Sequence, residues 1–212
     1  MPILLTFGDS NTHGTPPIVD RGEYRRFGRG VRWPTVTQAA LGAEWDLVEE
    51  GLPGRTAQYD DPVMGDIMNG RPALRMALQS HGPVDVMTLM LGTNDVKTRF
   101  ATEPAQVVAG VAGLLDVAMS LEYQTRHGGF RILLICPPPV IETGPIATEF
   151  WGGARRSQAL APLYAELAQS RGVGFLDAGK VIAVSPIDGV HFDEAAHMKL
   201  GLAVADGIKA LI

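Results

Sequence analysis

Five short strand-like segments recur along the 212 residues, and segments with helical periodicity separate them. The strand-like segments cover residues 3–7, 45–49, 86–91, 132–136 and, more weakly, 174–176. The third and fourth are almost continuous in apolar residues, as expected for strands that are buried on both faces of a sheet. Strands that alternate with helices predict an α/β fold, in which helices cover both faces of a parallel sheet.

Two helical segments have clear signals. Apolar residues recur at helical spacing over residues 107–119, and Thr102 and Pro104 precede them as start signals. The last helix is expected from about Asp193, which is a suitable N-cap residue, to Leu211. No linker, repeat or charge block divides the chain, so we expect a single domain over residues 1–212.

Composition narrows the class of protein. The hydrophobic content of 46% supports a sizeable core, and the net charge of -5 leaves no basic stripe for nucleic acid. No apolar stretch approaches the roughly 18 residues that span a bilayer, and the first residues lack a basic leader. The single Cys136 permits no intramolecular disulfide. A cytoplasmic enzyme is therefore expected, with no membrane or nucleic-acid partner.

Polar and glycine residues follow the predicted strands where each strand ends. Ser10 follows the first strand, Gly54 the second and Asn94 the third, and His191 lies beyond the fifth. In open α/β sheets, ligands bind beyond the carboxyl ends of the strands. We therefore expect these four distant segments to converge at one edge of the sheet.

A nucleophilic hydrolase could be built from three residues, Ser10, Asp188 and His191. A serine hydroxyl needs a base to remove its proton, and that base needs a third group to orient it. Asp188 and His191 lie three residues apart, so that the carboxylate can hold the imidazole. Ser10 could instead cap a helix, and the Asp–His pair could be an incidental surface loop. A metal site is the less favoured reading, because no ligand spacing is present among the other histidines, His13, His81, His127 and His197.

An oxyanion hole is expected beside the serine. It would consist of the backbone N–H groups of Ser10 and Gly54 and the side-chain amide of Asn94. Gly54 could otherwise be a plain turn glycine, and Asn94 a helix cap. For Asp95 we favour a capping role.

Four sequence blocks resemble those of the SGNH hydrolases, also called GDSL-type esterases. The blocks are FGDSNT, EEGLPGRT, GTND and DGVHF, and they occur in the family order over nearly the whole chain. The resemblance implies a flavodoxin-like, three-layer α/β/α sandwich with a five-stranded parallel sheet. It also implies Ser10 as nucleophile, Gly54 and Asn94 in the oxyanion hole, and His191 with Asp188 completing the triad. Asn11 departs from the leucine in the family name, at a variable position.

Further segments are similar to the short-chain arylesterase and acyltransferase subgroup. They are RWPTVTQAALG, EEGLPGRT with the following DDP, MLGTNDVKTRF, PPPV and FLDAGKVI. Some members of this subgroup form octamers and transfer acyl groups to alcohols or hydrogen peroxide. The resemblance implies small acyl donors such as acetate esters, and a homo-oligomer whose neighbouring subunits narrow the pocket.

Three long loops leave the carboxyl ends of the strands, and loops of this length are usually functional or interfacial. We call residues 16–32 the first loop, 53–71 the second and 137–153 the third. The first loop is rich in arginine with interleaved aromatics, which fits a solvated lid or a subunit contact equally well. Candidate pocket residues are Asp9, Asn11, Lys97, Ile146, Phe150 and Trp151. For Lys97 and Arg99 a solvated helix face is favoured over substrate contact, and Phe150 and Trp151 could instead be ordinary core.

The sequence therefore predicts a serine esterase for short acyl esters that needs no cofactor and no metal. A carbohydrate acetylesterase, a thioesterase or a lysophospholipase could use the same triad. A catalytically silent binding module is the remaining alternative, and four convergent polar residues argue against it.

Overall fold

A computed structural model describes all 212 residues, and its centre is a five-stranded sheet. The strands are β1 (Ile3–Gly8), β2 (Asp46–Gly51), β3 (Val86–Met90), β4 (Arg131–Cys136) and β5 (Gly174–Asp177). All neighbouring strands are parallel, in the order β2-β1-β3-β4-β5. This is the flavodoxin-like order, so the predicted sheet is confirmed, with strand ends shifted by at most two residues.

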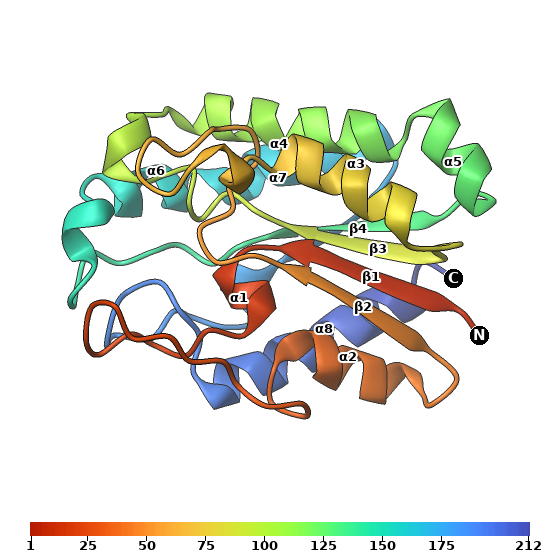
Figure 1. Cartoon of the computed structure of the whole chain (residues 1–212), viewed down its shortest axis with the longest axis horizontal. Helices are drawn as coiled ribbons and strands as arrows, with labels where there is room; N and C mark the ends of the chain where they lie inside the picture. The colour runs from red at the N-terminus through yellow and green to blue at the C-terminus, as the bar shows by residue number, and fades with distance from the viewer.

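Helices cover both faces of the sheet, as predicted (Figure 1). Helices α2 (Trp33–Leu41) and α8 (Glu194–Lys209) pack on one face. On the other face lie α3 (Gly70–Ser80), α4 (Pro104–Ala118) and α7 (Leu160–Arg171), with α5 (Leu121–His127) and α6 (Gly153–Gln158) beside them. The short elements are α1 (Ser10–His13) and the 3-10 turns η1 (Asp66–Met68), η2 (Thr98–Phe100), η3 (Ala147–Glu149) and η4 (Ala178–Lys180).

No single helix has both the length and the apolar character needed to cross a membrane. Helices α4 and α5 meet that test only as a pair with a 52° bend between them, and by length and composition alone.

Local signals explain where two of these helices begin. Pro104 is the first residue of α4, as predicted, but Glu103 rather than Thr102 is the N-cap, in a capping box with Gln106. The Thr102 hydroxyl instead donates to the carbonyl of Asp95, at 2.7 Å. The carboxylate of Asp193 accepts from the N–H of Ala196 at 2.8 Å, which confirms it as the cap of α8.

The core forms two layers because side chains alternate across each strand. In β3, Met87 and Leu89 face the layer under α3, α4 and α7, while Val86 and Met90 face α2 and α8. Both pairs of residues are at most 1% exposed. Burial on both faces explains why the central strands are almost continuously apolar.

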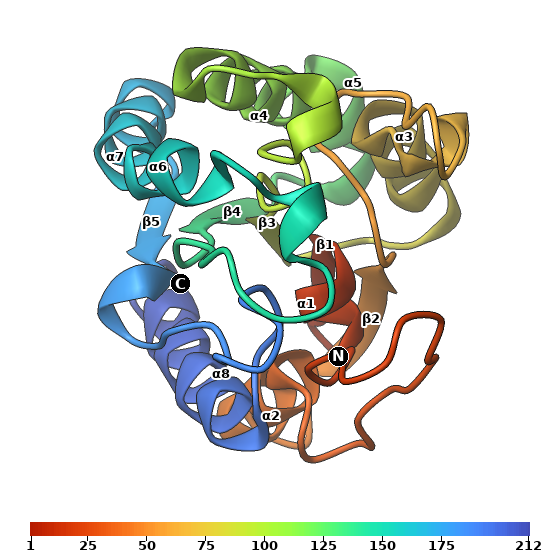
Figure 2. The ribbon, with the colours of Figure 1, turned by 90° about the vertical axis from the view of Figure 1, so that its left-hand side faces the viewer.

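The carboxyl ends of the strands all lie at one end of the molecule. Figure 2 looks onto this end, where α1 lies centrally and the first and third loops run around it. The strand order reverses between β1 and β3, so Ser10 and Asn94 follow the two strands that flank the switch point. The topology therefore places the predicted site where open α/β sheets bind their ligands.

Candidate active site

Ser10 is the first residue of α1, which begins two residues after β1 ends. Asp9 is the N-cap of this helix, and its carboxylate accepts from the N–H of Asn11 at 2.9 Å. The alternative of Ser10 as a helix cap is therefore wrong. With Asp9 as the cap, the Ser10 hydroxyl can engage another side chain.

That side chain is His191. Its Nε2 lies 3.0 Å from Oγ of Ser10, and its Nδ1 lies 2.6 Å from Oδ2 of Asp188. The backbone N–H of Ile18 donates to the same Oδ2 at 2.7 Å. The other carboxylate oxygen accepts from the N–H groups of Val190, at 3.0 Å, and His191, at 2.9 Å. Asp188 is fully buried and therefore has a fixed orientation. The incidental surface-loop reading is excluded for this pair.

The third loop supports the Asp188–His191 segment from outside. The N–H of Ile141 donates to the carbonyl of Gly189 at 2.9 Å. Gly189 has φ +75°, and a Cβ at this position would collide with the carbonyl oxygen of Ile141. Only glycine allows the two backbones to come this close, and the contact fixes the turn between Asp188 and His191.

The predicted oxyanion donors lie on the loops after β1, β2 and β3. The Nδ2 of Asn94 donates to the carbonyl of Arg55 at 3.0 Å and makes a longer contact, 3.4 Å, with Oδ2 of Asp9. Gly54 has φ +92°, a conformation that favours glycine. The backbone N–H groups of Ser10 and Gly54 donate to no protein atom. These donors remain available to a ligand.

Asp95 does not cap a helix, contrary to our expectation. Its carboxylate oxygens lie 2.9 and 3.0 Å from the backbone nitrogen of Ala57, and the side chain is fully buried. This contact crosses from the loop after β3 to the loop after β2. A partner 38 residues away in sequence was not visible in the local capping pattern.

A cavity of about 220 Å³ joins these groups. Ser10, Gly54, Asn94 and His191 line it, so the predicted convergence is present. Of the candidate pocket residues, Lys97, Ile146 and Phe150 also line the cavity.

The other three candidate pocket residues do not line the cavity. Asp9 is 1% exposed and is in contact with Asn94, while Nδ2 of Asn11 donates to the carbonyl of Val190 at 3.1 Å. Both therefore support the site from beneath. Trp151 is 59% exposed, because Phe150 beside it takes the buried position and is only 2% exposed. The sequence showed two adjacent aromatic residues but not which of them points inward.

Comparison with known proteins adds independent evidence. The model of the GDSL-like Lipase/Acylhydrolase family matches residues 6–199. The chain belongs to this family. It is an SGNH-type ester hydrolase, and the four sequence blocks all lie within the matched residues. A search of curated proteins finds no significant match.

Several solved structures share the fold of this hydrolase over its whole length. Est24, a carbohydrate acetylesterase from Sinorhizobium meliloti, is 34% identical, with a TM-score of 0.94 and 100% of both chains covered. The aryl esterase of M. smegmatis is 36% identical, with a TM-score of 0.93 and the same coverage. A putative arylesterase from Agrobacterium tumefaciens is 38% identical, with a TM-score of 0.89, again over both full chains.

Burial and hydrogen bonding set the charge of the hydrolase's buried carboxyls. Burial raises the pKa of Asp9 to about 6 and that of Asp95 to about 7, although backbone N–H groups partly oppose this. At Asp188 burial acts in the same direction, but the hydrogen bond and charge of His191 and the N–H of Ile18 outweigh it and lower the pKa. Asp188 is therefore the carboxyl best suited to stay ionised.

Lys97 lies in the cavity wall and not on a solvated helix face. It is 5% exposed, and its ammonium lies 3.8 Å from Oε2 of Glu149 and 5.7 Å from the centre of the Phe150 ring. Burial, and then the charge of Arg99, lower its pKa, while Glu149 raises it. Arg99 pairs with Asp61 and Glu149 and lines a neighbouring hollow instead.

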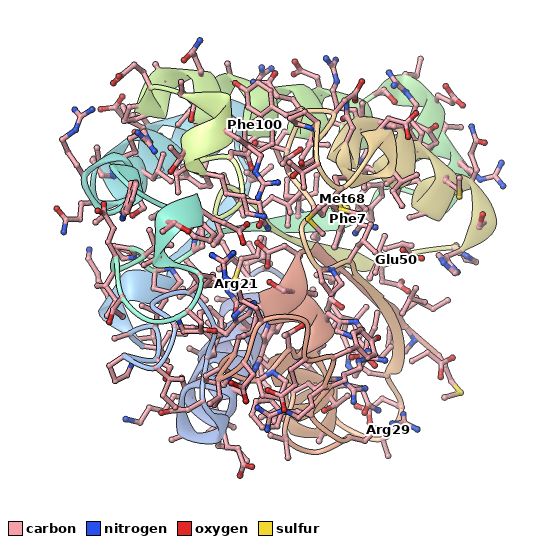
Figure 3. The ribbon with its side chains drawn as sticks, turned by 60° about the vertical axis from the view of Figure 1, so that its left-hand side comes forward. Phe7, Arg21, Arg29, Glu50, Met68 and Phe100 are labelled. Carbon is pink, nitrogen blue, oxygen red and sulfur yellow. The ribbon has the colours of Figure 1, made fainter.

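The first loop contributes directly to the site. Arg26 and Arg32 pair with Glu49. Arg21, which is labelled in Figure 3, donates to the carbonyl of Pro145 and the hydroxyl of Thr148 on the third loop. The arginine and aromatic content of this loop is visible in the sequence, but the course of its turns is not. The cavity residues not identified from the sequence are Thr15, Ile18, Glu23, Tyr24, Arg25, Pro53, Met64, Glu149 and Val190.

Two further expectations from the sequence concern Cys136 and the metal-site alternative. Cys136 is a free, buried thiol whose pKa burial raises, which confirms its place in the core. Both ring nitrogens of His191 have hydrogen-bond partners, and no group of three or more His, Cys, Asp or Glu side chains is placed to hold a metal ion. The metal-site reading at Asp188 and His191 has no ligand set.

Proposed function

We propose that this hydrolase cleaves short-chain carboxylic esters, of the acetyl type, through an acyl-enzyme formed on Ser10. The observation that carries the proposal is the hydrogen-bonded chain from Ser10 through His191 to Asp188, at 3.0 and 2.6 Å. Nucleophile, base and orienting carboxylate in this arrangement form a catalytic triad. The family and the three relatives described above support an ester as the substrate.

Each of these three hydrogen-bonded residues then has a role in the reaction. Oγ of Ser10 attacks the ester carbonyl carbon while Nε2 of His191 takes the hydroxyl proton. The C–O bond to the alcohol breaks, and His191 returns that proton to the departing oxygen. A water molecule then attacks the acyl carbon while His191 takes one of its protons. The bond between that carbon and Oγ breaks, and His191 returns the proton to Oγ, which releases the acid and restores Ser10. Asp188 stabilises the imidazolium in both halves of the cycle.

The negative charge of the tetrahedral intermediate needs donors that are already in place. The N–H groups of Ser10 and Gly54 and the amide of Asn94 can supply three. The carbonyl of Arg55 accepts one N–H of the Asn94 amide. The other N–H makes only the long, 3.4 Å contact with Oδ2 of Asp9, which the oxyanion can replace. One such donor typically contributes about 3 kcal/mol to transition-state stabilisation.

The cavity favours a small acyl group. Its volume of about 220 Å³ lies below the roughly 300–1,000 Å³ of sites for drug-sized ligands. The apolar side chains of Ile146 and Phe150 in its wall suit a methyl or short alkyl group. A thioesterase or lysophospholipase acting on long acyl chains fits this volume poorly, whereas a carbohydrate acetylesterase remains compatible with it.

Hydrolysis of p-nitrophenyl acetate, butyrate and octanoate by the wild-type protein, with and without a chelator, tests this proposal. We expect fast turnover of acetate, a steep fall toward octanoate, and no effect of the chelator. Octanoate turnover equal to that of acetate would contradict the short acyl pocket. Loss of all turnover with the chelator would contradict the serine mechanism.

Three finer expectations are part of the same proposal. Transfer of the acyl group to alcohols or hydrogen peroxide is detected as the new ester or peracid formed when either acceptor is added. A homo-oligomer, with an octamer as the form implied by the resemblance, is tested by light scattering behind a sizing column. A cytoplasmic location is tested by fractionating the source cells.

A further inference from the structure

The Lys97 ammonium lies in the wall of the catalytic cavity, beside the oxyanion donor Asn94. The backbone N–H of Lys97 donates to the carbonyl of Asn94 at 3.1 Å, so one turn separates the two residues. Lys97 lines the same cavity as Ser10 and His191, and it is 5% exposed. A cation is therefore buried within the space that the substrate enters.

This ammonium has no hydrogen bond to a protein atom. Its one ion-pair contact is Oε2 of Glu149 at 3.8 Å, which is beyond hydrogen-bond distance. Arg99 takes that same oxygen at 2.5 Å and also pairs with Asp61 at 3.0 Å. Glu149 is therefore committed to Arg99, and the three N–H donors of Lys97 have no protein acceptor within hydrogen-bond distance.

Nζ of Lys97 is not one of the fully buried, unpaired side-chain atoms, so water in the cavity can hydrate it. A ligand that displaces this water must replace its hydrogen bonds, so one that supplies an acceptor oxygen is favoured over one that does not. The charges around the cavity indicate which kind of acceptor oxygen is favoured. The two positive charges of Lys97 and Arg99 are balanced by the two negative charges of Glu149 and Asp61, and Arg25 at the cavity pairs with Glu23. A carboxylate would add an unmatched negative charge next to the developing oxyanion. A hydroxyl or ether oxygen adds none.

The proposed oxyanion donors take the carbonyl oxygen, and a short acyl group carries no other oxygen. The acceptor for Lys97 therefore belongs to the alcohol portion of the ester. We propose that Lys97 is a specificity-determining residue that donates a hydrogen bond to a hydroxyl oxygen of the alcohol portion. The enzyme then selects acetyl esters of polyols over acetyl esters of simple alcohols. This inference rests on the proposed ester hydrolysis at Ser10.

Two esters of nearly equal shape test the inference. 2-Hydroxyethyl acetate and n-propyl acetate differ by a terminal hydroxyl in place of a methyl group. We expect the wild-type enzyme to prefer the hydroxyethyl ester in kcat/KM by about 10-fold or more, after correction for alkaline hydrolysis rates. Lys97→Met, which keeps most of the length of the side chain but has no N–H donor, should lower this ratio by about the same factor. Lys180→Met, at an exposed lysine on η4, should leave the ratio unchanged.

Several results would overturn the inference. A wild-type ratio near one contradicts it even where Lys97→Met fails to fold. An unchanged ratio in a folded Lys97→Met contradicts it as well. Preference for the anionic ester acetoxyacetate over hydroxyethyl acetate would show that Lys97 binds a carboxylate instead. If the wild-type enzyme turns over neither neutral ester, the proposed function itself fails, whereas turnover of both at equal rates removes only the role of Lys97.

Discussion

Both carboxylate oxygens of Asp95 lie within 3.0 Å of the backbone nitrogen of Ala57. The contact joins the loop that carries Asn94 to the loop that carries Gly54. A second tie between the same loops runs from the Asn94 amide to the carbonyl of Arg55. The two loops follow different strands, so these contacts fix the distance between two of the proposed oxyanion donors.

Removal of this contact should slow catalysis more than it weakens binding. We expect Asp95→Ala to lower kcat about 100-fold, because a misplacement of about 1 Å can cost that much, while KM changes less. Asp95→Asn retains an acceptor for the N–H of Ala57 and should restore much of the loss. Equal kcat in the two variants, with equal thermal unfolding midpoints, would contradict a positioning role.

Asp188→Asn tests the orientation of His191. An amide oxygen can still accept from the backbone N–H groups, so the fold should persist. The ring then loses its anionic partner and adopts the wrong tautomer, for which kcat should fall by about 10⁴-fold. Steady-state kinetics with p-nitrophenyl acetate measure the change, and a loss below about 10-fold would show that Asp188 does not serve His191 in this way.

Asn94→Ala removes the side-chain donor from the proposed oxyanion hole. We expect kcat to fall by about 10²–10³-fold, since this donor acts mainly in the transition state. KM should change little. A variant that raises KM alone would indicate that Asn94 binds the ground-state ester.

His197 predicts a pH dependence of stability. Burial lowers its pKa from the ordinary 6.5 to about 4, and its Nδ1 accepts from the N–H of Trp33 at 3.2 Å. Because the unfolded chain binds the proton more readily, His197 contributes stability above pH 6.5 that is lost as the pH falls toward 4. The loss is on the order of 3 kcal/mol, at about 1.4 kcal/mol for each pKa unit.

Denaturant unfolding of the wild-type protein and of His197→Asn, at pH 7 and at pH 4.5, measures this contribution. The variant keeps an acceptor for Trp33 but has no group that titrates in this range. The wild-type protein should lose more unfolding free energy than the variant on acidification. A difference between the two proteins that does not change with pH would contradict the assignment.

The sheet and the proposed catalytic residues could be predicted from the sequence because regular periodicity and short motifs identify them. The β3 and β4 strands were identifiable because burial on both faces leaves them almost wholly apolar. Ser10, Gly54, Asn94 and His191 were identifiable because each follows a strand at the same sheet edge. These signals are local in sequence, and parallel topology converts them into one site.

The predictions that were wrong concern residues whose surroundings come from loops distant in sequence or without periodicity. The partner of Asp95 is Ala57 on another loop, and the sequence shows only a carboxyl before a helical turn. Lys97 looked like a residue of a solvated face, but the third loop covers it with Phe150. Trp151 was placed in the pocket because no periodicity exists over the third loop to tell inward from outward positions. Tyr24 and Arg25 were not assigned because nothing local predicts the course of the first loop.

The central claim, that Ser10 is the nucleophile, is tested most directly by its covalent modification. The protein is treated with diethyl p-nitrophenyl phosphate, which phosphorylates activated serines, and peptide mass mapping then locates the label while residual esterase activity is measured. The account predicts one diethylphosphoryl group per chain, on Ser10, in parallel with the loss of activity, and no label in His191→Ala. Loss of activity with the label on another residue, or full activity with Ser10 labelled, would contradict it.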